Sequence, residues 1–416
     1  MPVHQNLKIN TKNTPELILQ PRESKRDYTY DYFAFVSVGG KKDLFGRGGG
    51  ISTDQLEAKN KAMGEALERY CGSKVNLPLK RASFHQIQKI AIDPKKLICF
   101  SDLQYSEKFA YKKYNPDQLI DWVKGYSITK KKSVFVPAFS VYLGYNRLIP
   151  ASEHFVPTSS IGLAIQTSIE KAIIKGIFEI IERDAAMITW LIKKKVHRIN
   201  LKKVSLPKLI YLRDKIFAEK LSLEVIVSTV DISIPSTIAI IFDRAKKIPY
   251  ASLGLSTEID LEESAAKSIE EALMIRNTLE ILKRKRTLRK LNMSSIKNFL
   301  DHATFYSFPE HRKFWNFLMR GKLYSSGVIN KKYGLKKHKL NNIKEITKLL
   351  EKLKKEVIYV DVTDDIVRKM GFRAVRVVMP EMQAMDLSYK ARFLGGARLE
   401  KLARKKQLNF RPHPFA

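Results

Sequence analysis

The sequence predicts an α+β fold in which mixed β-sheets pack against long helices. Apolar residues recur with a period of about 3.6 in three long segments, at 55–72, 172–184 and 261–282. Short apolar runs rich in β-branched residues lie between them and are typical of strands. Two of the helical segments repeat the same polar residues at the same spacing, so the fold should contain an internal pseudo-repeat.

The composition is that of a globular chain with a substantial core. It has 416 residues, 44% of them hydrophobic, which allows one large domain or two to three smaller ones. No apolar run approaches the roughly 18 residues of a membrane span, and residues 1–13 lack the apolar segment of a signal peptide. We therefore expect a cytoplasmic protein without membrane contact. Cys71 and Cys99 are too few for a disulfide framework.

The net charge of +34 is extreme. The basic residues are mostly lysines spread along the whole chain, with the densest runs at 283–290 and 331–339. No aromatic residues that could stack on bases are interleaved with these runs, so the charge favours an acidic partner or an anionic nucleotide over nucleic acid. A non-catalytic basic scaffold or nucleic-acid-binding protein is the alternative that the charge leaves open.

The first half of the chain begins with an irregular polar arm, residues 1–30, followed by a strand at 33–38. The glycine cluster Gly46–Gly50 is then expected to form a turn into the helix at 55–72. Residues 134–142 read as an apolar strand with its proline near one edge.

The second half alternates strands and helices. A turn of small residues at 158–164 leads into the second long helix. The expected elements after it are a strand pair (223–229 and 237–243), a third long helix (261–282), a helix at 343–355 and the strands 357–362 and 372–379 of a parallel or mixed sheet. Residues 283–345 have the composition of a Lys-rich mobile insertion. The proline-rich tail, residues 409–416, cannot continue a helix.

A polar motif occurs twice on these helices. It consists of Glu65, Glu68 and Arg69 on the first helix and Glu179, Glu182 and Arg183 on the second, with Glu271 and Arg276 as a weaker match on the third. Carboxylates three residues apart repel each other on a bare helix, and a hard divalent cation between them turns that repulsion into binding.

Two interpretations of this motif are open. Surface helices with intrahelical Glu–Arg pairs, worth about 0.3–0.5 kcal/mol each, would explain a single occurrence. The duplication, with a turn of small residues before each helix, favours a shared site. In that site the four glutamates of the first two helices would bind Mg²⁺, and the arginines would meet phosphate charge.

These residues resemble the YcaO superfamily. The resemblance is carried by the two Glu-x-x-Glu-Arg helices, the Ser159-Ser160-x-Gly162 entry and the third helix ending in Arg276. It runs over roughly residues 30 to 416 and is closest to the discrete cyclodehydratase subunits of the streptolysin-type group. Supporting marks are Asp121–Gly125, Glu179–Ala185, Asp301–His302, Arg373–Glu381 and the tail Pro412–Ala416.

The resemblance implies a YcaO domain over 31–416 that uses ATP and Mg²⁺. Such enzymes phosphorylate a backbone amide of a ribosomal precursor peptide and convert Cys, Ser or Thr to thiazoline or oxazoline. By motif match, the metal ligands are Glu65, Glu68, Glu179 and Glu182, and the nucleotide site adds Arg69, Arg183, Glu271 and Arg276. Arg183 and the tail residues Pro412 and Pro414 are the implied catalytic residues, with the tail ending at the active site.

The resemblance also implies partners. They are the precursor peptide and an E1-like or ThiF-like protein that recognises its leader, and a flavin dehydrogenase and a homodimer are compatible with it. Thioamide- or amidine-forming relatives share the same activation and remain the alternative enzyme class.

Five positions depart from the usual family pattern: Ala62, Gln166, Lys171, Met274 and Ala416. Lys171 and Met274 each remove a polar nucleotide contact that relatives have. Elsewhere, we expect His302 and His413 to be structural hydrogen-bonding residues and Cys71 to be a buried inert thiol.

Overall fold

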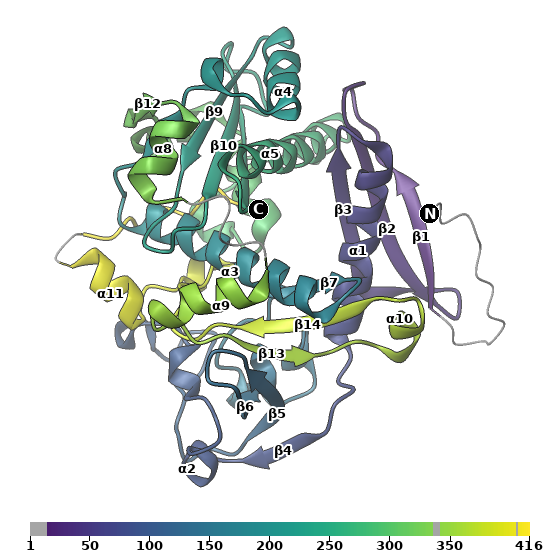
Figure 1. The fold of residues 1–416 in the computed structure, drawn as a ribbon, viewed down its shortest axis with the longest axis vertical. Coiled ribbons are helices and arrows are strands. Elements are labelled where there is room, and N and C mark those ends of the chain that lie inside the picture. Colours follow the sequence, from purple (N-terminus) through teal and green to yellow (C-terminus); the bar gives the residue numbers. More distant parts are fainter. Residues whose placement is uncertain (1–14, 336–341, 405–406) are drawn as a thin grey trace.

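The computed structural model describes residues 15–335, 342–404 and 407–416, and Figure 1 shows their arrangement. They form three β-sheets, and the helix α3 (Ile169–Leu191) lies between the two larger sheets. The predicted α+β class, with long helices packed on sheets, is confirmed.

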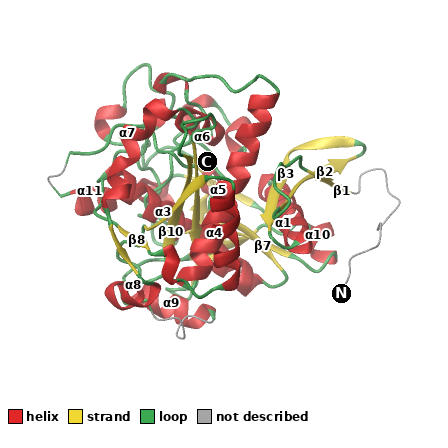
Figure 2. Cartoon of the chain, turned by 90° about the horizontal axis from the view of Figure 1, so that it is seen from above, coloured by secondary structure: helices red, strands yellow, loops and turns green. Residues whose placement is uncertain are grey.

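The smallest sheet is an antiparallel arrangement of β1 (Pro15–Pro21), β2 (Tyr30–Val38) and β3 (Lys41–Ser52). The helix α1 (Gln55–Ser73) packs on β2 and β3, and the sheet projects from the rest of the molecule in Figure 2. The prediction of an irregular arm is wrong for residues 15–21, because this segment pairs along its whole length with β2; residues 1–14 of the arm lie outside the described residues.

The second sheet has five strands and contains the predicted strand pair. Its order is β11 (Ala251–Thr257), β10 (Ser236–Asp243), β9 (Leu221–Val227), β8 (His197–Ile199) and β12 (Lys322–Tyr324). Only the β8–β12 pair is parallel. Successive residues of β10 face opposite sides. Ile238 and Ile240 pack toward the core around the end of α3, and Ala239 and Ile241 toward α4 (Pro207–Ala218) and α5 (Leu261–Arg284).

The third sheet has six strands, all antiparallel. Its order is β4 (Leu79–Ala82), β5 (Ile120–Ser127), β13 (Ile358–Asp361), β14 (Arg373–Val378) and β7 (Leu163–Gln166), with β6 (Lys132–Pro137) also on β5. The expected parallel or mixed pairing is wrong for β13 and β14. The short link between them, with α10 (Asp365–Lys369), returns the chain antiparallel instead of making the longer crossover that parallel strands need.

Helix α3 is the central element of the fold. Apolar residues surround most of its circumference because it packs on β7 and β14 on one side and on β10 and β11 on the other. It is longer than the predicted 172–184 segment and is capped at its N-terminus by Ser168, whose side chain accepts a hydrogen bond from the Lys171 backbone N–H.

The Lys-rich region is part of the core. It contains α6 (Phe299–Tyr306), α7 (Arg312–Trp315) and α8 (Ser326–Tyr333), and Trp315 and Leu318 are fully buried. The prediction of a mobile insertion is therefore wrong for the described part of 283–345, because apolar residues between the lysines pack against the end of α3. Residues 336–341 of that segment lie outside the described residues. The remaining helices are α2 (Phe84–Ile87), α9 (Ile343–Lys352) and α11 (Ala397–Ala403).

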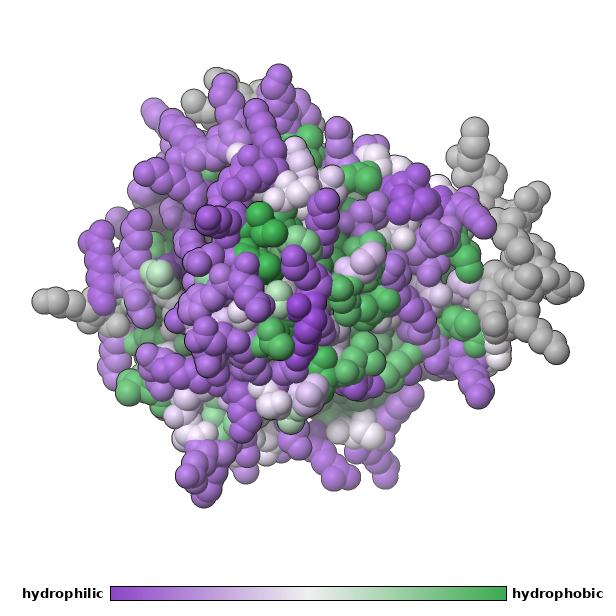
Figure 3. All heavy atoms as spheres, turned by 90° about the horizontal axis from the view of Figure 1, so that it is seen from below, coloured by the Kyte–Doolittle hydropathy of each residue, from purple (hydrophilic) through white to green (hydrophobic). Residues whose placement is uncertain are grey.

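The surface carries much of the charge. In Figure 3, hydrophilic side chains cover most of the lower face, and hydrophobic residues gather in patches near its centre. Among the described residues, none of the helices combines the length and apolarity required to cross a bilayer.

Candidate nucleotide and metal site

Three helices direct glutamates into one cavity of about 840 Å³. The cavity is open to solvent and is lined by α1, α3, α5 and residues 255–259 at the end of β11 and just after it. Its acidic residues include Glu65 and Glu68 from α1, Glu179 and Glu182 from α3, and Glu270 and Glu271 from α5. The structure thus brings together all four glutamates predicted to bind metal, together with Glu271.

One glutamate on each helix is oriented by a backbone N–H of the preceding strand or turn. Glu65 accepts from the Gly49 N–H at 2.6 Å and Glu179 from the Gly162 N–H at 2.9 Å. Glu271 accepts from the Leu255 N–H in the same way. Because this bond recurs 16 or 17 residues before each glutamate, the third helix is a fuller member of the repeat than its sequence indicated.

The glycine cluster lies in strand β3, so the predicted turn at Gly46–Gly50 is wrong. A Cβ at Gly48 would lie 2.5 Å from the Ala62 carbonyl oxygen of α1, and one at Gly254 would lie 2.2 Å from the Ser268 carbonyl oxygen of α5. Glycine is required at these two positions because the strand backbone lies directly against the backbone of the following helix.

Burial makes three of the cavity carboxylates, Glu68, Glu182 and Glu271, costly to ionise. Desolvation raises the pKa of Glu68 to about 7 and that of Glu182 to about 8, although Lys175 and Arg183 respectively oppose the shift. Desolvation also raises the pKa of Glu271. A group of buried carboxylates with raised pKa values is the donor set that a divalent cation stabilises in its charged form.

Lysines share the cavity with the glutamates. Lys175 Nζ lies 3.1 Å from Glu68 Oε2, and Lys61 Nζ lies 2.8 Å from Glu270 Oε2. Lys171 and Met274, two of the departures from the family pattern, also line the cavity. The mixture of carboxylates and ammonium groups suits a ligand that carries both Mg²⁺ and phosphate charge.

The three predicted arginines differ in position. Arg183 lies between two cavity glutamates, with its nitrogens 3.5 Å from Glu182 and 3.7 Å from Glu271. Arg69 pairs with Glu65 at 2.5 Å on the side facing β3, where it also donates to the Arg47 carbonyl. Arg276 is buried beside Glu280 at 3.3 Å. None of the three arginines is among the residues that line the cavity, so their phosphate contacts stay predictions.

Residues 412–415 of the C-terminal tail are buried, and the tail is anchored by its backbone. Trp190 Nε1–H donates to the Arg411 carbonyl at 2.9 Å, and the Tyr306 hydroxyl donates to the Pro412 carbonyl at 2.6 Å. Phe415 packs in the core beside Trp190. Pro412 and Pro414 are buried but do not line the cavity, so their catalytic assignment stays a prediction.

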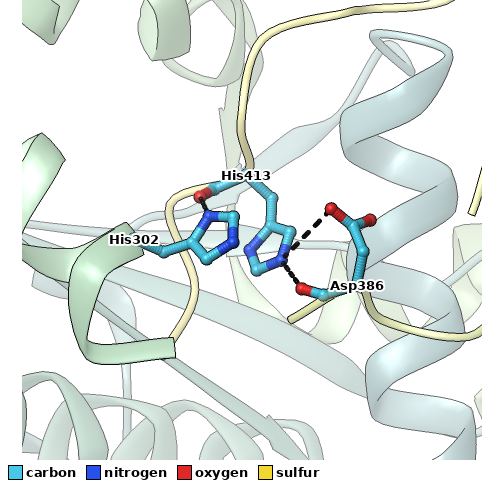
Figure 4. A group of neighbouring side chains, drawn as sticks. All are labelled: His302, Asp386 and His413. Atoms are coloured by element: carbon cyan, nitrogen blue, oxygen red, sulfur yellow. Dashed lines mark hydrogen bonds and ion pairs between the residues drawn. The ribbon is translucent and has the colours of Figure 1, made fainter. Parts of the chain in front are cut away.

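Two histidines hold the end of this tail, as Figure 4 shows. The rings of His302 and His413 stack with centroids 3.8 Å apart, and His302 Nδ1–H donates to the His413 carbonyl at 2.7 Å. His413 accepts from the Phe415 N–H through Nδ1, so its Nε2–H donates to the Asp386 carbonyl at 2.7 Å. The ring of His413 is therefore neutral, and desolvation lowers the pKa of both histidines to about 3.

The prediction that His302 and His413 are structural hydrogen-bonding residues is confirmed, but the sequence reasoning missed that their rings contact each other. His302, Asp386 and His413 form the one group of three potential ligands within 4.8 Å that the described residues contain. Parallel rings cannot both direct a lone pair at one ion, and Arg392 lies 3.4 Å from the Asp386 carboxylate, so the group fits a tail anchor better than a metal site. The signal available in the sequence was that Asp301–His302 and Pro412–Ala416, the two segments that contain these histidines, both support the YcaO resemblance.

Comparison with known proteins accounts for this arrangement. Residues 49–383 match the protein family described as YcaO cyclodehydratase, ATP- and Mg²⁺-binding. The chain belongs to the YcaO family. Its cofactors are accordingly ATP and Mg²⁺, and the acidic cavity described above fits both. An uncharacterised protein of Methanothermobacter thermautotrophicus is 23% identical over 346 residues, which are 81% of this chain and 82% of that protein.

Solved YcaO structures share the fold. A heterocyclase in complex with substrate and cofactor has a TM-score of 0.77 and 21% identity over 96% of this chain. The YcaO protein of Methanopyrus kandleri, bound with AMPPCP and Mg²⁺, has a TM-score of 0.61 and 17% identity over 88% of this chain and 85% of its own. A chain of the E. coli microcin synthetase McbBCD complex has a TM-score of 0.64 and 14% identity over 96% of both chains.

The lengths of these relatives differ from that of this chain. This chain spans 55% of the heterocyclase solved with substrate and cofactor, and 51% of the heterocyclase TruD, which has a TM-score of 0.66 and 20% identity over 87% of this chain. The rest of each heterocyclase has no counterpart in the match.

Proposed function

We propose that this YcaO protein is an ATP-dependent cyclodehydratase subunit that converts Cys, Ser or Thr of a ribosomal precursor peptide to thiazoline or oxazoline. The observation that carries the proposal is one cavity into which three helices direct five glutamates. These are Glu65, Glu68, Glu179, Glu182 and Glu271, and Arg183 lies beside the last two. If these helices were only solvated surface helices, there would be no reason for a backbone N–H of the preceding strand or turn to orient one glutamate on each of them.

The proposed reaction has two steps. The side-chain sulfur or oxygen of the peptide residue attacks the preceding carbonyl carbon and loses its proton, and the carbonyl oxygen takes the γ-phosphoryl group of ATP. Phosphate then leaves with that oxygen while the nitrogen loses its proton, which forms the C=N bond of the azoline. The protein contributes mainly positioning and charge stabilisation, as in other phosphoryl transfers.

Each predicted residue has a role in this scheme. Glu65, Glu68, Glu179 and Glu182 would hold Mg²⁺, which neutralises phosphate charge when bound. Arg183, fixed between Glu182 and Glu271, would bind the transferring phosphoryl group. In the same proposal, Arg69 and Arg276 move toward phosphate on binding.

The proposed partners follow from the relatives. One relative was solved with substrate and cofactor, and another in the McbBCD complex with pro-MccB17 bound. We propose that this chain likewise acts on a precursor peptide and requires an E1-like protein that recognises the leader. A flavin dehydrogenase would act afterwards, on the azoline.

Reconstitution tests the proposal. The protein, an E1-like partner, a Cys- and Ser-containing precursor peptide and Mg²⁺-ATP should give one ADP, one phosphate and the loss of one water mass per heterocycle. Glu179→Ala and Glu182→Ala should abolish this mass loss while the circular dichroism spectrum is retained. ATP binding without any change in peptide mass would contradict the cyclodehydratase assignment.

Product mass also separates the alternative enzyme class. Thioamide formation exchanges oxygen for sulfur and raises the peptide mass, and macrocyclic amidine formation loses water by attack of an amine. Thiol alkylation of the product distinguishes the last case, because a Cys consumed in a thiazoline no longer reacts.

A further inference from the structure

A second, smaller cavity lies beside the nucleotide site. It has a volume of about 140 Å³ and opens to solvent. Its apolar wall includes three methionines and two phenylalanines: Met379, Met382, Met385, Phe139 and Phe393. We call it the methionine pocket.

The polar groups of the methionine pocket are largely occupied. Arg376 donates to the carbonyls of Val141 at 2.9 Å and Ser159 at 2.5 Å, and also to that of Ile161. The Gln383 side-chain amide donates to the Phe393 carbonyl at 2.9 Å. A polar ligand would therefore lose hydration here without gaining equivalent hydrogen bonds.

Arg183 connects the methionine pocket to the nucleotide cavity. Its side chain lines the pocket, while its guanidinium is 3.5 Å from Glu182 and 3.7 Å from Glu271, which line the nucleotide cavity. The C-terminal tail reaches the same place, because His413 hydrogen-bonds to the Asp386 carbonyl next to the pocket residue Met385. If a substrate peptide presents an amide to a phosphoryl group at Arg183, the side chains next to that amide in the peptide would lie at this pocket.

The size of the methionine pocket matches one side chain. Its volume of about 140 Å³ is close to that of an apolar cavity of about 150 Å³ that binds benzene. Methionines adapt their shape to different apolar groups, so the pocket suits a phenyl, branched aliphatic or thioether group.

We propose that the methionine pocket binds one apolar side chain of the peptide substrate, next to the amide that is activated. The proposal rests on the proposed peptide-modifying function and deepens it by naming a substrate feature. It makes Met382, Met385 and Ala384, which all line the pocket, specificity-determining residues.

Binding can be measured without catalysis. The full chain with ¹³C-methyl methionine is titrated with N-acetyl-phenylalanine methylamide and, in parallel, with N-acetyl-serine methylamide. We expect saturable shifts of the Met379, Met382 and Met385 methyl signals with the phenylalanine amide alone. Ala384→Leu, which fills the pocket, should remove the shifts, and Ala245→Leu, at an exposed turn, should not. Absent shifts, or equal shifts with both amides, would overturn the proposal.

Turnover separates this proposal from the function on which it rests. In the reconstituted reaction, replacing an apolar residue beside the modified position by serine should lower kcat/KM by about 10- to 100-fold. Ala384→Leu should reduce that preference and leave the affinity for Mg²⁺-ATP unchanged. Equal kcat/KM values for both peptides would refute the methionine pocket and leave the cyclodehydratase function standing. Methyl shifts without any peptide modification would support the methionine pocket and contradict the cyclodehydratase function.

Discussion

At the residue scale, the nucleotide cavity concentrates negative charge that the protein alone does not neutralise. Glu270 is paired with both Lys61 and Lys208, at 2.8 and 2.7 Å, whereas within the described residues Glu182 is paired with Arg183 alone, at 3.5 Å. The difference marks Glu182 as a carboxylate arranged for a ligand and Glu270 as a structural one.

Replacing Glu182 by Gln should therefore weaken Mg²⁺-dependent ATP binding at least tenfold, since even indirect partners of a metal ion cost about 10–100-fold in affinity. Isothermal calorimetry with Mg²⁺-ATP measures the effect. Glu170→Gln is the matched control, because Glu170 is exposed in the first turn of the same helix. Equal affinities for the two variants would contradict the metal assignment.

The stacked histidines predict a second residue-scale effect, on acid stability. His302 and His413 have a folded-state pKa of about 3, against about 6.5 when unfolded. Below pH 6.5 the unfolded chain binds protons that the folded chain excludes, so stability falls as the pH falls, by about 1.4 kcal/mol per pH unit for each histidine. Asp386 and Arg392 face the pair and lie 3.4 Å from each other, and desolvation raises the pKa of Asp386.

His302→Asn tests this effect because it keeps an N–H donor and removes the titrating ring. Urea unfolding at pH 7.5 and 5.0 should show a smaller loss of stability on acidification than in the unmodified protein. His85→Asn, at an exposed site, should leave the loss unchanged. An unchanged loss in His302→Asn would show that His302 is not a neutral buried group.

At the element scale, glycines set the distance between each strand and its helix. Gly48 and Gly254 bring β3 and β11 against the backbones of α1 and α5, and this contact orients Glu65 and Glu271. Packing and site geometry therefore depend on the same residues.

Gly254→Ala should destabilise the fold by about 1–3 kcal/mol, the usual cost of overpacking, and should also weaken Mg²⁺-ATP binding by displacing Glu271. Gly327→Ala, in α8, places its Cβ in open space and should be neutral or slightly stabilising. Thermal unfolding and calorimetry report the two effects. If Gly254→Ala were destabilised but bound the nucleotide with unchanged affinity, the claim that Gly254 sets both the packing and the site geometry would be contradicted.

The tail is the other element whose role can be isolated. Pro412→Ala and Pro414→Ala should lower kcat for peptide modification while leaving ATP affinity unchanged, because neither residue lines the nucleotide cavity. Steady-state kinetics with the precursor peptide give kcat, and calorimetry gives the affinity. A parallel loss of ATP affinity would place the prolines in nucleotide binding instead of catalysis.

At the scale of the whole molecule, sequence reasoning succeeded where one local pattern determined the outcome. The three long helices and the β9–β10 pair follow from periodicity, and the glutamates converge because their helices pack together. It failed where long-range packing decides. Gly46–Gly50 reads as a turn until α1 lies against it, and the Lys-rich region reads as mobile until Trp315 is buried beside Phe242 of β10. His302 and His413, 111 residues apart, carry no local sign of their contact.

The same long-range packing makes nucleotide binding a property of the whole fold. Helices α1, α3 and α5 pack on different sheets and meet around the cavity, so one bound ligand joins all three. A ligand at 100 times its Kd should raise the free energy of unfolding by about 2.7 kcal/mol. Hydrogen exchange should slow in the cavity-facing turns of all three helices.

The size of this stabilisation should depend on pH. Glu68 and Glu182, with pKa values raised to about 7 and 8, are increasingly ionised as the pH rises, and desolvation makes their ionised forms costly although Lys175 and Arg183 lie beside them. The free energy of unfolding of the ligand-free protein therefore falls as the pH rises from about 5 to about 8. Mg²⁺ binds only their ionised forms, so the increase in Tm caused by Mg²⁺-ATP should be larger at pH 8.5 than at pH 6.0. Glu182→Gln should flatten this trend, and an increase in Tm that is the same at both pH values would place the metal on other ligands.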